Sequence, residues 1–138
     1  VPPRPLRDTA SGGELSRAML AIRGMVTIGD DVETLIFDEV DAGIGGVTAA
    51  ALGERLARLA ERRQIVCITH LPQVAAHAER QFAIVKRSDP VAATTETVVA
   101  RVEGGERLAE LCRMLGAAAD DEAARQHAQG LLERAGRA

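Results

Sequence analysis

Hydrophobic and polar residues along the chain follow two patterns, and each pattern predicts a different element. Apolar residues that recur at helical spacing predict helices. The first such stripe runs from Leu15 to Val26 and follows an S-x-x-E capping box at residues 11–14, which is typical of a helix start. Later stripes predict four more helices, over residues 47–62, 72–79, 106–115 and 120–134.

Short apolar runs between the stripes predict strands at residues 34–37, 64–69, 82–85 and 95–102. The first two runs are continuously apolar, which is typical of strands buried on both faces. Strands and helices alternate through the middle of the chain, and this order predicts an α/β fold with a mostly parallel sheet flanked by helices. Turn-forming residues at 88–90 also allow the last two strands to form an antiparallel hairpin.

Composition and charge are typical of one soluble globular domain. The chain has 138 residues, 46% of them hydrophobic, and 17 Lys and Arg against 20 Asp and Glu give a net charge of −3. This balance argues against a general polyanion-binding module, although it leaves room for a local basic patch. Two phenylalanines with no Trp or Tyr exclude the aromatic platforms of single-strand binders.

The cysteines, the apolar runs and the first residue indicate the compartment of the protein and whether the sequence is part of a longer one. Cys67 and Cys112 lie in different apolar segments without CxxC spacing, which favours reduced, buried thiols over a disulfide or a zinc site. No apolar run has the length of a signal peptide core or a membrane span, so we expect a cytoplasmic protein with no membrane partner. Because the chain begins with Val1 rather than Met, we expect a piece of a longer protein.

Candidate chemistry gathers where the first two predicted strands end. Asp38, Glu39 and Asp41 follow the first strand, and His70 follows the second. In open α/β sheets, ligands bind beyond the carboxyl ends of the strands. One carboxylate there can hold Mg²⁺ through its waters, and another can receive a proton from an attacking water. The alternatives are an acidic turn without function and a metal-dependent nuclease built on the three acidic residues.

Glycines and the remaining histidines give weaker signals. The Ser-Gly-Gly segment at residues 11–13 opens a helix whose backbone N–H groups can hold a phosphate, although a capped helix start explains it equally well. The glycine loop at 43–46 is better interpreted as a flexible turn, because it lacks the Lys-Ser/Thr ending of a P-loop. His77 and His127 lie on predicted helices, and we interpret both as ordinary surface or satisfied residues.

Four segments, in this order, resemble one half of an ATP-binding-cassette head. They are residues 9–17 (TASGGELSR) for the signature, 34–39 (TLIFDE) for Walker B, 40–46 (VDAGIGG) for the D-loop region and 68–75 (ITHLPQVA) for the switch histidine. The motifs are most similar to the C-terminal part of the ATPase head in the RecN family of bacterial DNA repair and recombination proteins, relatives of the SMC proteins. Gly45 stands where most cassettes have the D-loop aspartate, so we carry over no catalytic role there.

The resemblance implies a role for each matching residue. The signature supplies the cofactor-binding set, Ser11, Gly12, Gly13 and Glu14, of which the first three contact the γ-phosphate of an ATP held mainly by a partner head. Asp38 supports Mg²⁺, Glu39 orients or deprotonates the attacking water, and His70 senses the γ-phosphate. Phosphoryl transfer depends mostly on such positioning and charge stabilisation.

The resemblance also implies the organisation of the chain and its partners. Residues 1–10 form an extended segment, and residues 11–138 form the C-terminal lobe of the head. No G-x-x-x-x-G-K-[ST] motif occurs in the sequence, so we expect this lobe alone to hydrolyse no ATP. Implied partners are the N-terminal half of the same head with its Walker A motif and coiled coil, a second head in an ATP-dependent dimer, and DNA through the full-length protein, in the bacterial cytoplasm at the nucleoid. The alternative is a non-catalytic interaction or scaffold module.

Overall fold

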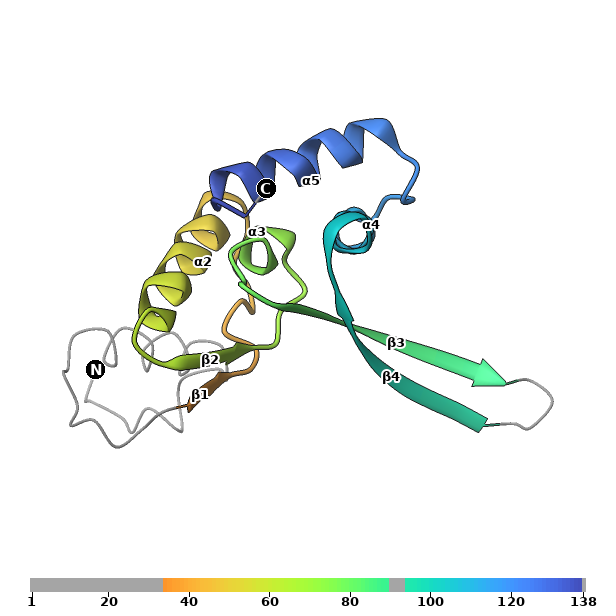
Figure 1. Ribbon diagram of the computed structural model, residues 1–138, viewed down its shortest axis with the longest axis horizontal. Helices are drawn as coiled ribbons and strands as arrows, with labels where there is room; N and C mark the ends of the chain where they lie inside the picture. Colours follow the sequence, from red (N-terminus) through yellow and green to blue (C-terminus); the bar gives the residue numbers. More distant parts are fainter. Residues whose placement is uncertain (1–33, 90–93, 138) are drawn as a thin grey trace, which may run out of the picture. The chain divides into compact units, whose positions relative to one another are not determined.

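The computed structural model describes residues 34–89 and 94–137 (Figure 1). The predicted capping box with Ser11, Gly12, Gly13 and Glu14 therefore lies outside the described residues. The chain divides into two compact units, residues 1–77 and 78–138. Each unit has a small two-stranded sheet and helices, so the predicted α/β class is confirmed.

The first unit has a strand-helix-strand arrangement followed by a short helix. Its elements are β1 (Thr34–Phe37), α2 (Gly46–Ala60), β2 (Gln64–Cys67) and α3 (Pro72–Ala75). β1 and β2 pair in parallel, from Thr34 opposite Gln64 to Phe37 opposite Cys67, as the alternation of elements predicts. α3 ends before the predicted boundary at residue 79, because the chain turns at Ala76 and His77.

The core of the first unit lies between the β1–β2 pair and its helices. It consists of apolar residues from β1, the turn after β1 and the helices: Phe37, Val40, Ala49, Leu52, Leu56 and Val74. Ile65 and Cys67 of β2 are partly buried and pack against it. Within the part of the chain that the structure describes, no element covers the opposite face of the pair: Ile36 is 69% exposed, and Val66 and Ile68 are 43% and 49% exposed. The expectation of burial on both faces is thus wrong for these strands. Successive side chains point to opposite faces, and only one face is covered by the described residues.

A close contact between α2 and α3 depends on a glycine. Gly53 is buried, and a Cβ at this position would meet the ring of His77 and would lie 3.1 Å from the backbone oxygen of Gln73. Any larger residue therefore forces the two helices apart or displaces the His77 ring. The absence of a side chain at Gly53 thus allows α3 to lie close to α2.

The second unit begins with an antiparallel hairpin. β3 (Gln81–Asp89) pairs with β4 (Thr94–Val102) along their whole length, from Gln81 opposite Val102 to Asp89 opposite Thr94. The hairpin predicted from the turn residues is confirmed. Among the described residues, parallel pairing is thus confined to β1 and β2.

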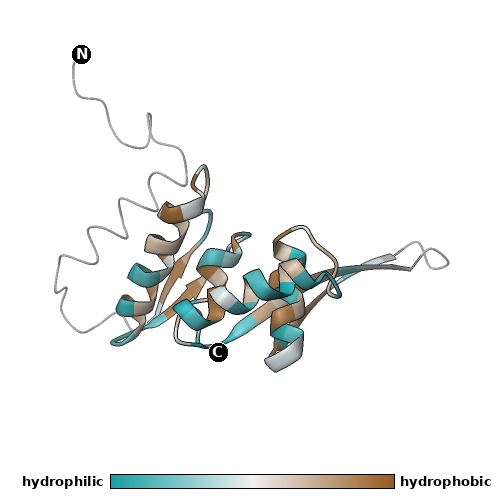
Figure 2. Ribbon diagram, turned by 90° about the horizontal axis from the view of Figure 1, so that it is seen from above, coloured by the Kyte–Doolittle hydropathy of each residue, from teal (hydrophilic) through white to brown (hydrophobic). Residues whose placement is uncertain are grey.

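Two helices complete the second unit. α4 (Gly104–Met114) and α5 (Glu122–Arg134) pack against each other (Figure 2). Their buried residues are aliphatic or sulfur-containing: Leu111, Cys112, Ala128, Leu131 and Leu132. The carboxylate of Asp121 accepts a hydrogen bond of 3.0 Å from the backbone N–H of Ala124, so α5 starts later than the predicted residue 120.

Candidate functional site

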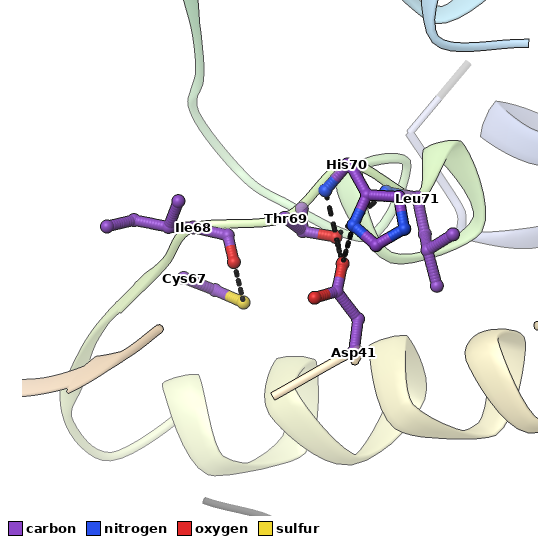
Figure 3. A network of polar contacts seen from close by, with 6 residues as sticks. All are labelled: Asp41, Cys67, Ile68, Thr69, His70 and Leu71. Atoms are coloured by element: carbon purple, nitrogen blue, oxygen red, sulfur yellow. Dashed lines mark hydrogen bonds and ion pairs between the residues drawn. The ribbon is translucent and has the colours of Figure 1, made fainter. Parts of the chain in front are cut away.

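The ends of β1 and β2 lie side by side. The backbone N–H of Ile68 donates to the carbonyl oxygen of Phe37 at 2.9 Å, which continues the parallel pairing just beyond β2. The residues that follow β1 and those that follow β2 therefore leave the sheet at the same edge. This arrangement brings Asp41 to Thr69 and His70, although they are separated by 28 and 29 positions in the sequence (Figure 3).

Asp41 is the centre of a network of polar contacts. Its side chain is buried, and one oxygen, Oδ2, accepts hydrogen bonds from the hydroxyl of Thr69 and, at 3.1 Å, from the backbone N–H of His70. The same oxygen lies 3.2 Å from Nδ1 of His70. The Thr69 hydroxyl oxygen in turn accepts from the backbone N–H of Leu71 at 3.0 Å. A buried carboxylate needs such donors, because desolvation of an unpaired charge is costly.

His70 is held from one side and open on the other. Its side chain is 73% exposed although its Nδ1 edge faces the buried carboxylate of Asp41. The contact with Asp41 favours the ring form that carries a proton on Nδ1, which fixes the orientation of the imidazole. The ring is therefore presented to the solvent in a defined direction, as a group that binds an external ligand must be.

Asp38 and Glu39 are exposed at the carboxyl end of β1, at the same edge. Glu39 has a backbone φ of 55°, and it is the one non-glycine residue with positive φ among the described residues. A glutamate in this left-handed region costs about 1 kcal/mol or more, and such conformations cluster at functional sites. The carbonyl oxygen of Glu39 accepts from the backbone N–H of Ala42 at 3.1 Å, which closes the turn.

The thiol of Cys67, the last residue of β2, is affected by the negative charges at this edge. Burial raises the pKa of its thiol to about 12, and the negative charges of Asp41 and Asp38 add to the rise. Both carboxylates therefore act on the end of β2. Cys67 and Cys112 are both free thiols, as the sequence predicts.

Among the described residues, Asp38 is the candidate ligand for Mg²⁺. Within residues 34–89 and 94–137, no group of three or more His, Cys, Asp and Glu side chains is arranged to hold a metal. Mg²⁺ needs less from a protein, since it keeps several waters and uses one or two carboxylates together with substrate phosphates. The exposed Asp38 fits such a partial site. The nuclease alternative fits less well, because the Asp41 carboxylate is engaged by Thr69 and His70.

The glycine loop at 43–46 is a turn, as predicted. Gly43 and Gly46 have φ values of 72° and 53°, in the region that favours glycine. The candidate cofactor-binding residues of the signature lie outside the described residues. Of the predicted set, the structure describes Asp38 and Glu39 after β1 and His70 after β2, at the same end of the parallel pair. Sequence reasoning gave Asp41 no role of its own beside His70. The pattern that could have indicated this pairing is an acidic residue after one predicted strand and a Thr-His pair after the next.

Comparison with known proteins gives one consistent result. No protein-family model matches the chain. A DNA repair protein RecN from Streptomyces coelicolor is 52% identical over 135 residues, which are 98% of this chain and 23% of that protein. A DNA repair protein RecN from Treponema pallidum is 48% identical over 131 residues, 95% of this chain and 22% of that protein. The chain therefore spans less than a quarter of the length of these curated relatives.

A solved structure supports the fold. It belongs to work titled as the structural biochemistry of ATP-driven dimerization and DNA-stimulated activation of SMC ATPases. The match has a TM-score of 0.54 at 14% identity and covers 81% of this chain and 65% of that one. At this identity the likeness concerns the fold alone. None of the described helices is long and apolar enough to span a membrane.

Proposed function

From its confirmed resemblance to RecN proteins along nearly its whole length, we propose that this chain is the C-terminal lobe of an ATP-hydrolysing head in a DNA repair protein. The observation that carries the proposal is the edge where β1 and β2 end. There the exposed Asp38 and Glu39 and the oriented ring of His70 leave the same side of a parallel sheet. Ligands of open α/β folds bind at such an edge.

Three residues divide the work of phosphoryl transfer. Asp38 helps to hold Mg²⁺, which neutralises charge on the phosphates of ATP when it is bound. Glu39 orients the attacking water or takes its proton, for which an exposed carboxylate at a fixed turn is suited. His70 contacts the γ-phosphate through the exposed part of its ring. Each of these acts by position and charge, so small displacements lower the rate.

Asp41 acts through His70 and is a positioning residue. Its carboxylate holds both the backbone N–H and Nδ1 of His70, so neither the residue nor its ring can turn freely. Nδ1 is thereby occupied, and contact with a phosphate falls to Nε2, the other ring nitrogen. Burial of the carboxylate strengthens this contact because water does not compete for it.

The remaining parts of the site come from other segments. Ser11, Gly12 and Gly13 of the signature would contact the γ-phosphate of an ATP held by a second head, which makes association of two heads a condition for hydrolysis. The Walker A motif would come from the N-terminal half of the same head. This lobe alone would then bind ATP poorly, because the lysine and backbone cradle for the phosphates are not in its sequence. DNA would be the partner of the full-length protein.

The experiment is a substitution of Glu39 in the full-length protein. We expect Glu39→Gln to keep ATP binding and association of heads while steady-state hydrolysis falls by about 10²–10⁴-fold, the usual contribution of a general base. Glu54→Gln is the matched control, since Glu54 is an exposed glutamate of α2 outside this edge. Unchanged hydrolysis in Glu39→Gln, or an equal loss in Glu54→Gln, would remove Glu39 from the mechanism.

A second candidate is an interaction or scaffold module without catalysis. The exposed apolar face of β1 and β2, with Ile36, Val66 and Ile68, favours it, since such faces mark contact surfaces. The two candidates differ in how this lobe associates with the N-terminal half of the head. Association that strengthens with ATP supports the ATPase, and association that is indifferent to nucleotide supports the module.

A further inference from the structure

A groove of about 450 Å³ in the second unit is lined by an excess of basic side chains. It lies along the end of β4, the start of α4 and the end of the chain after α5. Four arginines and two glutamates are its charged residues: Arg80, Arg101, Arg107, Arg137, Glu79 and Glu103. The chain as a whole carries a net charge of −3, so this groove concentrates positive charge against the balance of the molecule.

Arg107 is fixed at the wall of the groove. Its Nη2 donates to the carbonyl oxygen of Ala78 at 2.8 Å, and its Nε donates to the side-chain oxygen of Gln81 at 3.2 Å. Burial lowers the pKa of Arg107, and the positive charge of Arg137 lowers it further. Two guanidinium groups are therefore close enough to repel each other, and an anion between or beside them would relieve that repulsion.

The other charges of the groove differ in how they are engaged. Arg101 forms an ion pair with Glu103, which reduces its attraction for a ligand. Arg80 and Arg137 are exposed and line the groove together with the fixed Arg107. The first turn of α4 also lines the groove, and the N-terminus of a helix adds a partial positive charge.

We propose that this arginine groove binds phosphate groups of a DNA backbone. None of its lining residues is aromatic, so it offers no face on which a base could stack. Guanidinium groups are suited to phosphate oxygens, and here they come from three separate segments of the chain, as successive phosphates along a strand require. The inference rests on the proposed function, which makes DNA a partner, and it places a contact outside the nucleotide site of the first unit.

The experiment measures binding of the 138-residue chain to a fluorescein-labelled 30-base-pair duplex by fluorescence anisotropy over a series of salt concentrations. The test variant is Arg80→Ala with Arg137→Ala, and the matched control is Arg58→Ala with Arg62→Ala. All four residues are exposed, and Arg58 and Arg62 are outside the groove. Both variants lose two positive charges, so they differ only in where the charges were.

We expect the groove variant to bind about five- to tenfold more weakly at low salt and to lose about 2 from the slope of log affinity against log salt. The control should stay within about twofold of the unchanged chain, since non-specific attraction depends on clustered rather than total charge. Equal losses in both variants, or no loss in the groove variant, would overturn the proposal.

Two further measurements distinguish a DNA backbone from other anionic ligands of the groove. Inorganic phosphate and ATP, each added at the same ionic strength, should displace the duplex only at millimolar concentration, because one ligand cannot reach all the arginines. An acidic peptide that binds this groove when the duplex does not would overturn the assignment to DNA. None of these measurements requires ATP hydrolysis. A negative result for DNA binding therefore does not affect the test of Glu39→Gln, and a negative result for Glu39→Gln does not affect the test of the arginine groove.

Discussion

Asp41 in the first unit and Gln81 in the second are the two polar side chains that are buried within the described residues. Each lies near an end of a strand, and each is satisfied by residues distant in the sequence. Asp41 accepts from Thr69 and His70, whereas Gln81 accepts from Arg107 at 3.2 Å and its amide lies 3.9 Å from the sulfur of Met114.

The difference lies in what the partners do. One partner of Asp41 is the exposed imidazole of His70, so the buried charge orients a group that faces outward. The partners of Gln81 belong to α4, and the contact joins the start of β3 to this helix. Both buried polar groups therefore hold a side chain of a candidate site, and the two cases differ in how that side chain is placed. Asp41 holds an imidazole that is mostly exposed, whereas Gln81 holds the half-buried guanidinium of Arg107 in the wall of the arginine groove.

Substitution of these two residues should separate the two roles, with the largest effects expected here. We expect Asp41→Ala to lower the free energy of unfolding by about 2–3 kcal/mol and Gln81→Ala by about 1–2 kcal/mol, because each substitution leaves partly buried donors unsatisfied. In the full-length protein, Asp41→Ala should also lower ATP turnover by about 100-fold through misplacement of His70, and Gln81→Ala should leave turnover unchanged. Denaturant titration and steady-state hydrolysis provide the measurements.

A spectroscopic measurement distinguishes orientation of the His70 ring by Asp41 from a general loss of stability in the Asp41 variants. Nitrogen-15 NMR of the imidazole rings is tractable because the chain has three histidines. Nδ1 of His70 should carry a proton in the unchanged chain and lose this preference in Asp41→Asn. The same tautomer in both proteins would contradict the positioning role, whatever the turnover.

A second pair of substitutions compares the packing around a helical glycine in the first unit with that around a helical glycine in the second. We expect Gly53→Ala in α2 to lower the free energy of unfolding by about 1–3 kcal/mol, since the new Cβ meets the His77 ring and the Gln73 oxygen. Gly130→Ala in α5 should raise it by about 0.5–1 kcal/mol, because the neighbour of that Cβ is the flexible end of Arg134 at 3.3 Å and alanine favours helix. Opposite signs in thermal unfolding would confirm the comparison, and equal signs would contradict it.

The smallest expected effect is the pH dependence of Cys67. Its pKa in the folded chain is raised to about 12 from the ordinary value of 9.0, so folding favours the protonated thiol. This contribution is complete below about pH 9 and is lost as the pH rises toward 12. The stability difference between the unchanged chain and Cys67→Ala should therefore shrink over that range, as followed by thermal unfolding. A constant difference would mean that neither burial nor the carboxylates at this edge raise the pKa of the thiol.

Much of the local structure could be predicted from the sequence. Apolar spacing located β1, α2, β2, α4 and α5 to within a few residues, because periodicity follows from which side of an element is buried. The exposure of Ile36 could not be predicted in this way. A continuously apolar run indicates that a strand is covered on both faces, but it does not say whether the covering element belongs to the same stretch of chain.

The residue types that the chemistry needs, and their place at strand ends, follow from the sequence alone: Asp38 and Glu39 after one apolar run, Thr69 and His70 after the next. The tertiary structure decided that Asp41, and neither of its two acidic neighbours, turns inward and holds His70. That choice depends on the parallel register of β1 and β2 and on the left-handed turn at Glu39. Both are properties of the paired strands in space, which spacing along one chain does not contain.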